Sequence, residues 1–381
     1  MLSFRIYGFD FSVTTCYDLN FSEKWLHQSP EAPPVLTNTD TAYHDIPLAM
    51  YIVFDEYSRN YFGIADLSYS YKIIREDGSL FTDSSGIIAF TGIADTDTGV
   101  LLSVCSPEIT FPRKEKTGTC QLIVTAEDRI SGKKNTRKKK IVLARYPSPD
   151  PNRFDVISFN VWVHNYCSNP DPARAVAAFI WFMNSESSNN DRIFWPVFYF
   201  FQCLFHNNPV LVEKLMEVYP QNTARVKEYT VLLLRVIEVD RKKTWPITGM
   251  QWKKFDTMKE TGFLDPFTIT IKSKSVQFME LGFYYYGRYD MIRFLIGCLG
   301  ANTAQGYEEF IGYCKKYDAT LAETIDNETA LQFNAYAGKI LSTAYSKHQL
   351  IRMYCDYTLA YEHLSSDAKQ ALRAIVLGAG K

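Results

Sequence analysis

Histidine is the side chain best suited to acid–base chemistry near neutral pH, and the sequence contains six histidines. They stand at positions 27, 44, 164, 206, 348 and 363. None lies in an HExxH or HxH pattern, so the spacing indicates no metal site. His206 and His348 fall at expected hairpin turns, where the end of a helix favours a partly positive side chain. His164 lies on an aromatic helix face and is expected to be a hydrogen-bonded histidine of the core or of an interface.

The usual motifs of nucleophilic and phosphate-binding sites are missing from the sequence, which has no GxSxG, Walker loop or GxGxxG. Cys167 follows His164 by three residues, so both could lie on one helix face. Nothing nearby supplies the group that would lower the thiol pKa. Acidic pairs such as Glu308 and Glu309 fall at expected helix starts, where they complement the helix dipole. We therefore predict no catalytic residue, no metal and no cofactor.

The eight cysteines are scattered without a CxxC pair, and most stand beside apolar residues. This pattern is typical of buried, reduced thiols. Cys105 and Cys120, on neighbouring expected strands, are the one pair that we consider for a disulfide. Whether they pair depends on a geometry that the sequence leaves open.

A basic run at residues 133–140 is the first candidate interaction surface. Its basic residues are Lys133, Lys134, Arg137, Lys138, Lys139 and Lys140. Such a run can bind phosphate groups of a nucleic acid or an anionic surface. Because no aromatic residues are interleaved to stack on bases, we favour the alternative of a solvated hairpin turn whose lysines protect a sheet edge.

Consecutive aromatic residues form the second candidate surface, at Phe283, Tyr284, Tyr285 and Tyr286. On a helix these four side chains cannot all face one core. Either the helix is covered on both sides within a layered bundle, or one face meets a partner. We favour the first alternative, because a helix that is apolar all round is usually buried.

The overall composition is that of a globular protein with 46% hydrophobic residues, 15% aromatic residues and a net charge of −1. A balance this close to neutral argues against a dedicated nucleic-acid binder. No run reaches the ~18 apolar residues of a membrane-spanning helix. Residues 1–15 lack the pattern of a signal peptide, so we expect a cytoplasmic protein, or an exported one if a leader once preceded Met1.

The first part of the chain is expected to be a β-domain over residues 1–146. Polar and apolar residues alternate over 2–7, 49–54, 65–74, 86–90, 100–104, 120–127 and 140–146, with turn signals between them. Short strands at this spacing predict an antiparallel β-sandwich of immunoglobulin-like size. The Pro-rich stretch 25–41 is expected to be a loop on the surface or over a sheet edge.

Residues 147–151 are expected to be a stiff, Pro-rich linker, and the period then changes from two to 3.6. An all-helical domain is predicted over 152–381, with a hairpin at 193–219 and with further helices at, among others, 272–286 and 327–345. Hairpin turns recur without a fixed period, so we predict an irregular helical-hairpin or solenoid-like domain. The fold class is multidomain α+β.

Short motifs in both halves resemble an uncharacterised bacterial family that joins an N-terminal β-sandwich to a C-terminal helical domain. They stand at 7–11, 47–51, 77–78, 118–120, 128–132, 200–209, 283–287 and 335–348. The resemblance covers most of the chain and implies this architecture. It implies no activity and no functional residue.

Three functions remain as hypotheses. The first is a non-catalytic binding or scaffolding protein with a protein partner, with self-association left open, because architectures of this kind often bind partners. The second is an enzyme of unrecognised type with a site in the cleft between the domains. The third is binding of an anionic surface or nucleic acid through residues 133–140.

Overall fold

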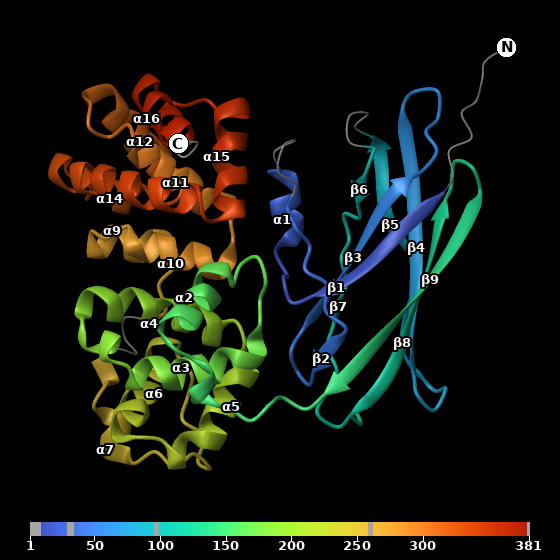
Figure 1. Ribbon diagram of the computed structural model, residues 1–381, viewed down its shortest axis with the longest axis horizontal. Coiled ribbons are helices and arrows are strands. Elements are labelled where there is room, and N and C mark those ends of the chain that lie inside the picture. Colours follow the sequence, from blue (N-terminus) through green and yellow to red (C-terminus); the bar gives the residue numbers. More distant parts are fainter. Residues whose placement is uncertain (1–8, 29–33, 95–98, 258–261, 379–381) are drawn as a thin grey trace. The chain divides into compact units, whose positions relative to one another are not determined.

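The computed structural model describes residues 9–28, 34–94, 99–257 and 262–378. The fold is mixed α+β, with a strand-rich region first and a helical region after it (Figure 1). The chain divides into two units. Residues 1–22 and 36–147 form the strand-rich unit, and residues 23–35 and 148–381 form the helical unit.

The strand-rich unit contains two sheets. Its strands are β1 (Asp10–Cys16), β2 (Thr41–Tyr43), β3 (Leu48–Glu56), β4 (Ile64–Arg75), β5 (Leu80–Ile93), β6 (Leu101–Leu102), β7 (Glu108–Ile109), β8 (Gly118–Asp128) and β9 (Lys133–Ala144). One sheet has the order β1-β3-β6, with β7 also paired to β3, and the other has the order β2-β9-β8-β4-β5. Neighbours are antiparallel except β2 and β9, which run parallel.

Both sheets contribute to one hydrophobic cluster in this unit. Met50 and Phe54 of β3 belong to it, as do Leu67 of β4 and Leu122 and Val124 of β8. Along β8, buried side chains alternate with more exposed ones, as expected for a sheet with one face toward a core. The strands predicted at 49–54, 65–74 and 120–127 are therefore confirmed, whereas the predicted strand at 2–7 lies outside the described residues.

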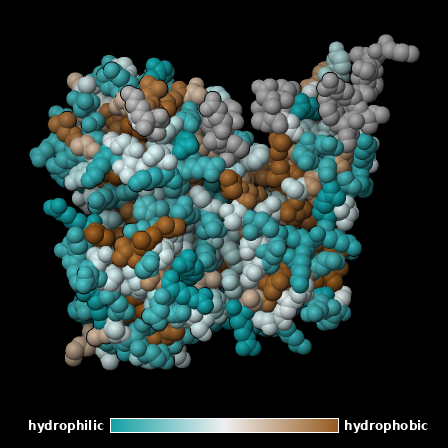
Figure 2. Space-filling model, viewed as in Figure 1, coloured by the Kyte–Doolittle hydropathy of each residue, from teal (hydrophilic) through white to brown (hydrophobic). Residues whose placement is uncertain are grey.

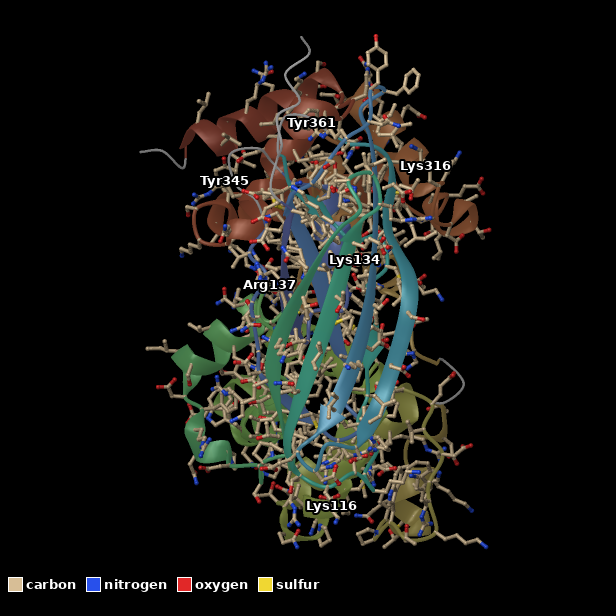
Figure 3. All side chains as sticks on the ribbon, turned by 90° about the vertical axis from the view of Figure 1, so that its right-hand side faces the viewer. Lys116, Lys134, Arg137, Lys316, Tyr345 and Tyr361 are labelled. Carbon is tan, nitrogen blue, oxygen red and sulfur yellow. The ribbon has the colours of Figure 1, made fainter. Side chains whose placement is uncertain are left out.

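The basic run does not form the hairpin turn that we favoured from the sequence. Residues 133–140 lie on β9, which pairs with β8 from Lys133 opposite Asp128 to Leu143 opposite Gly118. Figure 3 shows Lys134 and Arg137 along this strand. The turn itself is shorter and precedes the run, because the Asp128 side chain accepts hydrogen bonds from the backbone N–H of Ile130 and Ser131.

The helical unit is built from short and medium helices. These are α1 (Phe21–Leu26, which begins in the strand-rich unit), α2 (Val156–Asn165), α3 (Ala175–Asn184), α4 (Asp191–His206), α5 (Pro209–Val218), α6 (Ala224–Val236), α7 (Gly249–Lys253), α9 (Pro266–Ser273), α10 (Gln277–Tyr286), α11 (Tyr289–Cys298), α12 (Ala304–Cys314), α13 (Ala319–Ala322), α14 (Asn327–Tyr345), α15 (Gln349–Tyr361) and α16 (Ser366–Gly378). The predicted hairpin at 193–219 is confirmed, with α4 ending at His206 and α5 beginning at Pro209.

The single helix predicted over 272–286 is wrong. α9 ends at Ser273, Lys274 has a left-handed backbone with φ of 53°, and α10 begins at Gln277. α9 begins at Pro266 after the N-cap Asp265, whose side chain accepts hydrogen bonds from the N–H groups of Phe267 and Thr268.

A segment from the first part of the chain completes the helical unit. Lys24 is buried there, and its Nζ donates a hydrogen bond to the Cys167 carbonyl just after α2. The His27 ring stacks on Tyr289 with the ring centres 4.3 Å apart. The predicted surface loop at 25–41 is therefore only partly correct, because its first residues end α1 and pack among helices, while Thr41 begins β2 beside β9.

Candidate functional site

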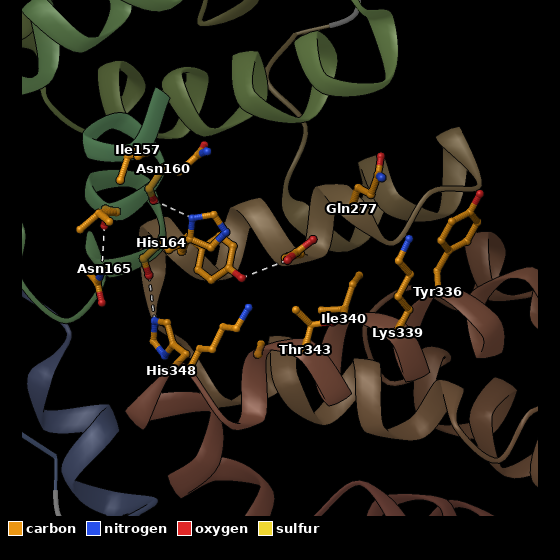
Figure 4. A pocket seen from close by; sticks show the side chains of 15 residues that line it. Ile157, Asn160, His164, Asn165, Gln277, Tyr336, Lys339, Ile340, Thr343 and His348 are labelled. Atoms are coloured by element: carbon orange, nitrogen blue, oxygen red, sulfur yellow. Dashed lines mark hydrogen bonds between the residues drawn. The ribbon is translucent and has the colours of Figure 1, made fainter. Parts of the chain in front are cut away.

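A pocket of about 630 Å³ opens within the helical unit (Figure 4). One face each of α2, α10 and α14 forms its walls and floor, and residues at the start of the α14–α15 turn close one end. This volume lies in the range of pockets that hold drug-sized ligands.

The α2 wall is apolar and exposed. Ile157 is 75% exposed and Val161 is 57% exposed, and both line the pocket. The wall is held in place by a capping box at the start of α2, in which Asp155 and Ser158 each bond the other's backbone N–H. Two uncovered β-branched side chains beside a pocket are suited to an apolar part of a ligand.

The α14 wall carries positive charge. Tyr336, Lys339, Ile340 and Thr343 recur at helical spacings, so they lie on one face of the helix, and Lys347 follows in the turn after α14. In Figure 4, Lys339 extends from α14 toward α10. The two lysine ammonium groups give this wall hydrogen-bond donors for an anionic group.

The floor contains a carboxyl group and a tyrosine, both from α10. The Tyr284 hydroxyl donates a 3.0 Å hydrogen bond to Oε1 of Glu280, one helical turn earlier. Burial raises the pKa of the Glu280 carboxyl above its ordinary value of 4.5, while the hydrogen bond and the nearby His164 oppose this shift. Burial also raises the pKa of Tyr284, so its hydroxyl remains a donor.

His164 lies beside this pair on α2. Its ring centre is 4.6 Å from that of Tyr284, and its Nδ1 lies 2.6 Å from the Asn160 carbonyl oxygen. A carbonyl oxygen can only accept, so Nδ1 carries a proton and donates a hydrogen bond to it. In the neutral ring, this tautomer leaves Nε2 as an acceptor.

His348 is a structural residue at the end of the pocket. It is the N-cap of α15, where Nδ1 accepts a hydrogen bond from the Ile351 N–H, and Nε2 lies 2.8 Å from the His164 carbonyl oxygen. Burial lowers the pKa of His348 to about 4. We expected His348 near the end of a helix, whereas it begins the next one and joins α15 to α2.

Cys167 contacts His348 rather than His164. Its Sγ lies 3.8 Å from Nε2 of His348, which already donates to the His164 carbonyl. The imidazole therefore has no lone pair directed at the thiol, and the contact does not create a nucleophile. Cys167 does not share a face of α2 with His164, because α2 ends at Asn165.

The four aromatic residues singled out in the sequence lie in the interior of the helical unit. Phe283 and Tyr284 are buried. Tyr285 stacks on Tyr166 and accepts a hydrogen bond from Asn208, and Tyr286 accepts one from Asn207. The helix is covered on several sides, which is the alternative that we favoured, and only Tyr284 lines the pocket.

Several basic residues of the run at 133–140 form ion pairs within the strand-rich unit. Lys134 pairs with Glu127 at 3.1 Å, Arg137 pairs with Asp10, and Lys139 pairs with Asp40 at 2.6 Å. Lys133, Lys138 and Lys140 lie on the same strand. These pairs leave less charge for a ligand than the sequence suggests, and binding of an anionic surface here stays a prediction.

Both cysteines considered for a disulfide are free. Cys105 is exposed, while Cys120 is buried on β8 opposite Ile141 of β9 and Arg75 of β4. The other six cysteines are buried thiols, as predicted.

Other candidate chemistry is limited in the part of the chain that the structure describes. Within it, no group of three or more His, Cys, Asp or Glu side chains is placed to hold a metal ion. No described helix is both long and apolar enough to cross a membrane. Exposed hydrophobic side chains form separate patches on the face shown in Figure 2.

Sequence reasoning missed Glu280, Lys339 and Lys347 as pocket residues. Gln277, Glu280 and Tyr284 share one helix face by spacing, which is a signal for a polar stripe on an otherwise aromatic helix. Nothing local could show that this stripe faces α14, which follows much later in the chain.

Comparison with known proteins gives little further guidance. No protein family and no curated protein matches the sequence. Among solved structures, a family 123 glycoside hydrolase from Clostridium perfringens that hydrolyses glycolipid glycans aligns at 11% identity with a TM-score of 0.23. The alignment covers 52% of this chain and 36% of the hydrolase, so the chain spans about a third of that protein. A likeness this weak identifies neither fold nor function.

Proposed function

We propose that this is a non-catalytic binding protein whose helical unit takes a ligand into the groove between α2, α10 and α14. The observation that carries the proposal is the pocket itself, which joins an exposed apolar wall to a wall with two lysines above a polar floor. Pockets that combine apolar surface with a few placed polar groups are typical of ligand-binding sites.

The hydrogen bonds of His348 and the burial of Cys167 support binding rather than nucleophilic catalysis. Both ring nitrogens of His348 are engaged in holding helices together, and Cys167 is buried against a nitrogen that donates elsewhere. A nucleophile needs an accepting base within reach, and these contacts supply none.

We also infer a role for the architecture around the groove. The strand-rich unit is best interpreted as a β-sandwich that serves as a docking module, since side chains of both sheets share one hydrophobic cluster. The helical unit is best interpreted as an irregular set of helical hairpins that supplies the binding surface, which is a common use of such folds.

A pocket-filling substitution tests the proposed function. Thr343→Trp places an indole in the groove from an exposed position on α14, and Ser342→Trp is the matched control, because Ser342 is exposed and does not line the pocket. We expect some members of a panel of peptides, fatty acids and nucleosides to raise the melting temperature of the full chain and of the Ser342→Trp variant. They should not stabilise Thr343→Trp, and ligands that stabilise both variants equally would refute the site.

An acid–base enzyme is the second candidate function, and one observation favours it. Glu280, whose pKa is raised, and His164 line the same pocket, which is the arrangement of groups that can exchange protons with a substrate. Mass spectrometry of a bound ligand after incubation separates the two candidates. An enzyme is established if the protein converts the ligand to a product and Glu280→Gln still binds the ligand but no longer converts it. A ligand that stays unchanged supports the binding protein.

A further inference from the structure

The groove holds opposite charges on different elements. The Glu280 carboxyl lies on the floor, and the ammonium groups of Lys339 and Lys347 belong to the α14 wall. Among the residues that the structure describes, no ion pair joins Glu280 to either lysine, and the groups that favour its charged form are the hydrogen bond from Tyr284 and the nearby His164. A cationic partner stabilises a partly buried carboxylate, and a ligand ammonium would supply that partner.

The apolar wall belongs to the same pocket as these charges. Ile157 and Val161 are exposed on α2 along the same pocket that Glu280 and Lys339 line. A ligand that satisfies all three surfaces needs a cationic group, an anionic group and apolar groups.

We propose that the groove binds a short apolar peptide with free ends. Its terminal ammonium would lie against Glu280 and Tyr284, its terminal carboxylate would lie against Lys339 and Lys347, and its side chains would pack on Ile157 and Val161. This inference rests on the proposed binding function and names the class of its ligand.

Alternative ligand classes satisfy fewer of these contacts. A fatty acid or another simple anion would bind the lysines and the apolar wall but would leave the Glu280 carboxyl without a partner. A simple cation would bind Glu280 but would face two ammonium groups across the groove. A single amino acid carries both charges but is too small for a pocket of about 630 Å³.

Isothermal titration calorimetry of the full chain with trileucine tests the inference. The matched probes are N-acetyl-trileucine, which lacks the terminal ammonium, and trileucine amide, which lacks the terminal carboxylate. We expect each modification to weaken binding by about tenfold, because each removes a charge-assisted hydrogen-bonded contact.

Two variants assign each end of the peptide to its wall. In Glu280→Gln, acetylation of the peptide should no longer change its affinity, while amidation should still weaken binding. In the double variant Lys339→Gln and Lys347→Gln, amidation should no longer matter while acetylation still does. Lys243→Gln with Lys253→Gln is the charge-matched control, because both are exposed lysines of the helical unit outside the pocket, and it should behave as the unmodified protein.

The possible outcomes separate this inference from the proposed function. The inference is overturned if trileucine and its two end-modified forms bind with equal affinity. It is also overturned if a protein with a native circular dichroism spectrum does not bind trileucine. If another class of ligand then binds in a manner that Thr343→Trp abolishes, the proposed function stands without it. If each variant loses only its sensitivity to the modification of the peptide end that its wall is proposed to bind, the result supports both the inference and the proposed function.

Discussion

Lowering the pH should destabilise the helical unit through His348, the N-cap of α15. The ordinary pKa of histidine is 6.5, and burial lowers that of His348 to about 4. The unfolded chain therefore binds a proton at a pH where the folded chain does not. The stabilisation from neutral His348 is complete above pH 6.5 and is lost as the pH falls toward 4.

The size of this effect follows from the two pKa values. At pH 5, which is about 1.5 units below 6.5, the folded ring is still mostly neutral. At about 1.4 kcal/mol per unit, the loss relative to pH 7 is about 2 kcal/mol. Other groups act in the opposite direction in this range, because the pKa of Glu23 and of Glu280 is raised in the folded state. The comparison must therefore be made between variants.

His348→Asn is the informative substitution, because asparagine can still cap α15 but does not titrate. Urea unfolding of the full chain, followed by far-UV circular dichroism, gives the free energy of unfolding at pH 7 and pH 5. We expect the loss between these two pH values to be about 2 kcal/mol smaller in His348→Asn than in the unmodified protein. Thr223→Asn, which exchanges one capping residue of α6 for another and removes no titrating group, is the control and should keep the unmodified dependence. An equal or larger pH-dependent loss in His348→Asn would refute the reasoning.

Three further predictions concern the described structure. Gly287→Ala should lower the free energy of unfolding by about 3 kcal/mol, because φ is +64° and the added Cβ would lie 2.6 Å from Cε of Lys24. Gly78→Ala, with φ of +84° and no atom within 4 Å, should cost only about 1 kcal/mol, and chemical denaturation compares the two. A thiol reagent should label Cys105 rapidly in the native protein and the other seven cysteines only after unfolding. Asp155→Ala should cost about 1 kcal/mol of stability, measured by thermal melting, because the α2 capping box is lost.

Each of these predictions has a result that would contradict it. Equal losses for the two glycine variants would show that the crowding beside Gly287 is relieved without cost. Rapid labelling of more than one thiol, or of none, would show that the burial of the cysteines is wrong. An unchanged melting temperature in Asp155→Ala would show that α2 does not depend on its cap.

Much of the helical fold was predictable, because local signals agree there with the final packing. The helix at 327–345 was predicted with the bounds it has, since Asp326 caps it and its period is regular. The start of α9 was missed because Asp265 and Pro266 signal a break and a helix start equally well. Only the surrounding structure distinguishes the two.

The first half of β9 was missed for a different physical reason. Lys134 and Lys138 lie on one side of the strand, while Arg137 and Lys139 on the other side pair with Asp10 and Asp40. Both sides are therefore polar, and the alternation that identifies a half-buried strand disappears.

The candidate site could be predicted only in fragments. His164 and Tyr284 stood out as residue types, but their approach depends on helix packing across more than a hundred residues. Glu280 and Lys339 are ordinary surface residues in sequence, and they become a site only where α10 and α14 share a pocket. Long-range packing of this kind leaves no local pattern.

The division of the chain into interleaved segments has a consequence for its synthesis. Residues 23–35 leave the ribosome long before the helices that they join, which begin beyond residue 148. Lys24 and His27 must therefore remain without their partners Cys167 and Tyr289 while the rest of the strand-rich unit is made. These contacts join residues far apart in the sequence, so this segment should dock slowly and only after its partner helices have been made. A fragment that starts after the linker would lack the segment altogether, and any single cut between the two units would leave the helical one unfinished.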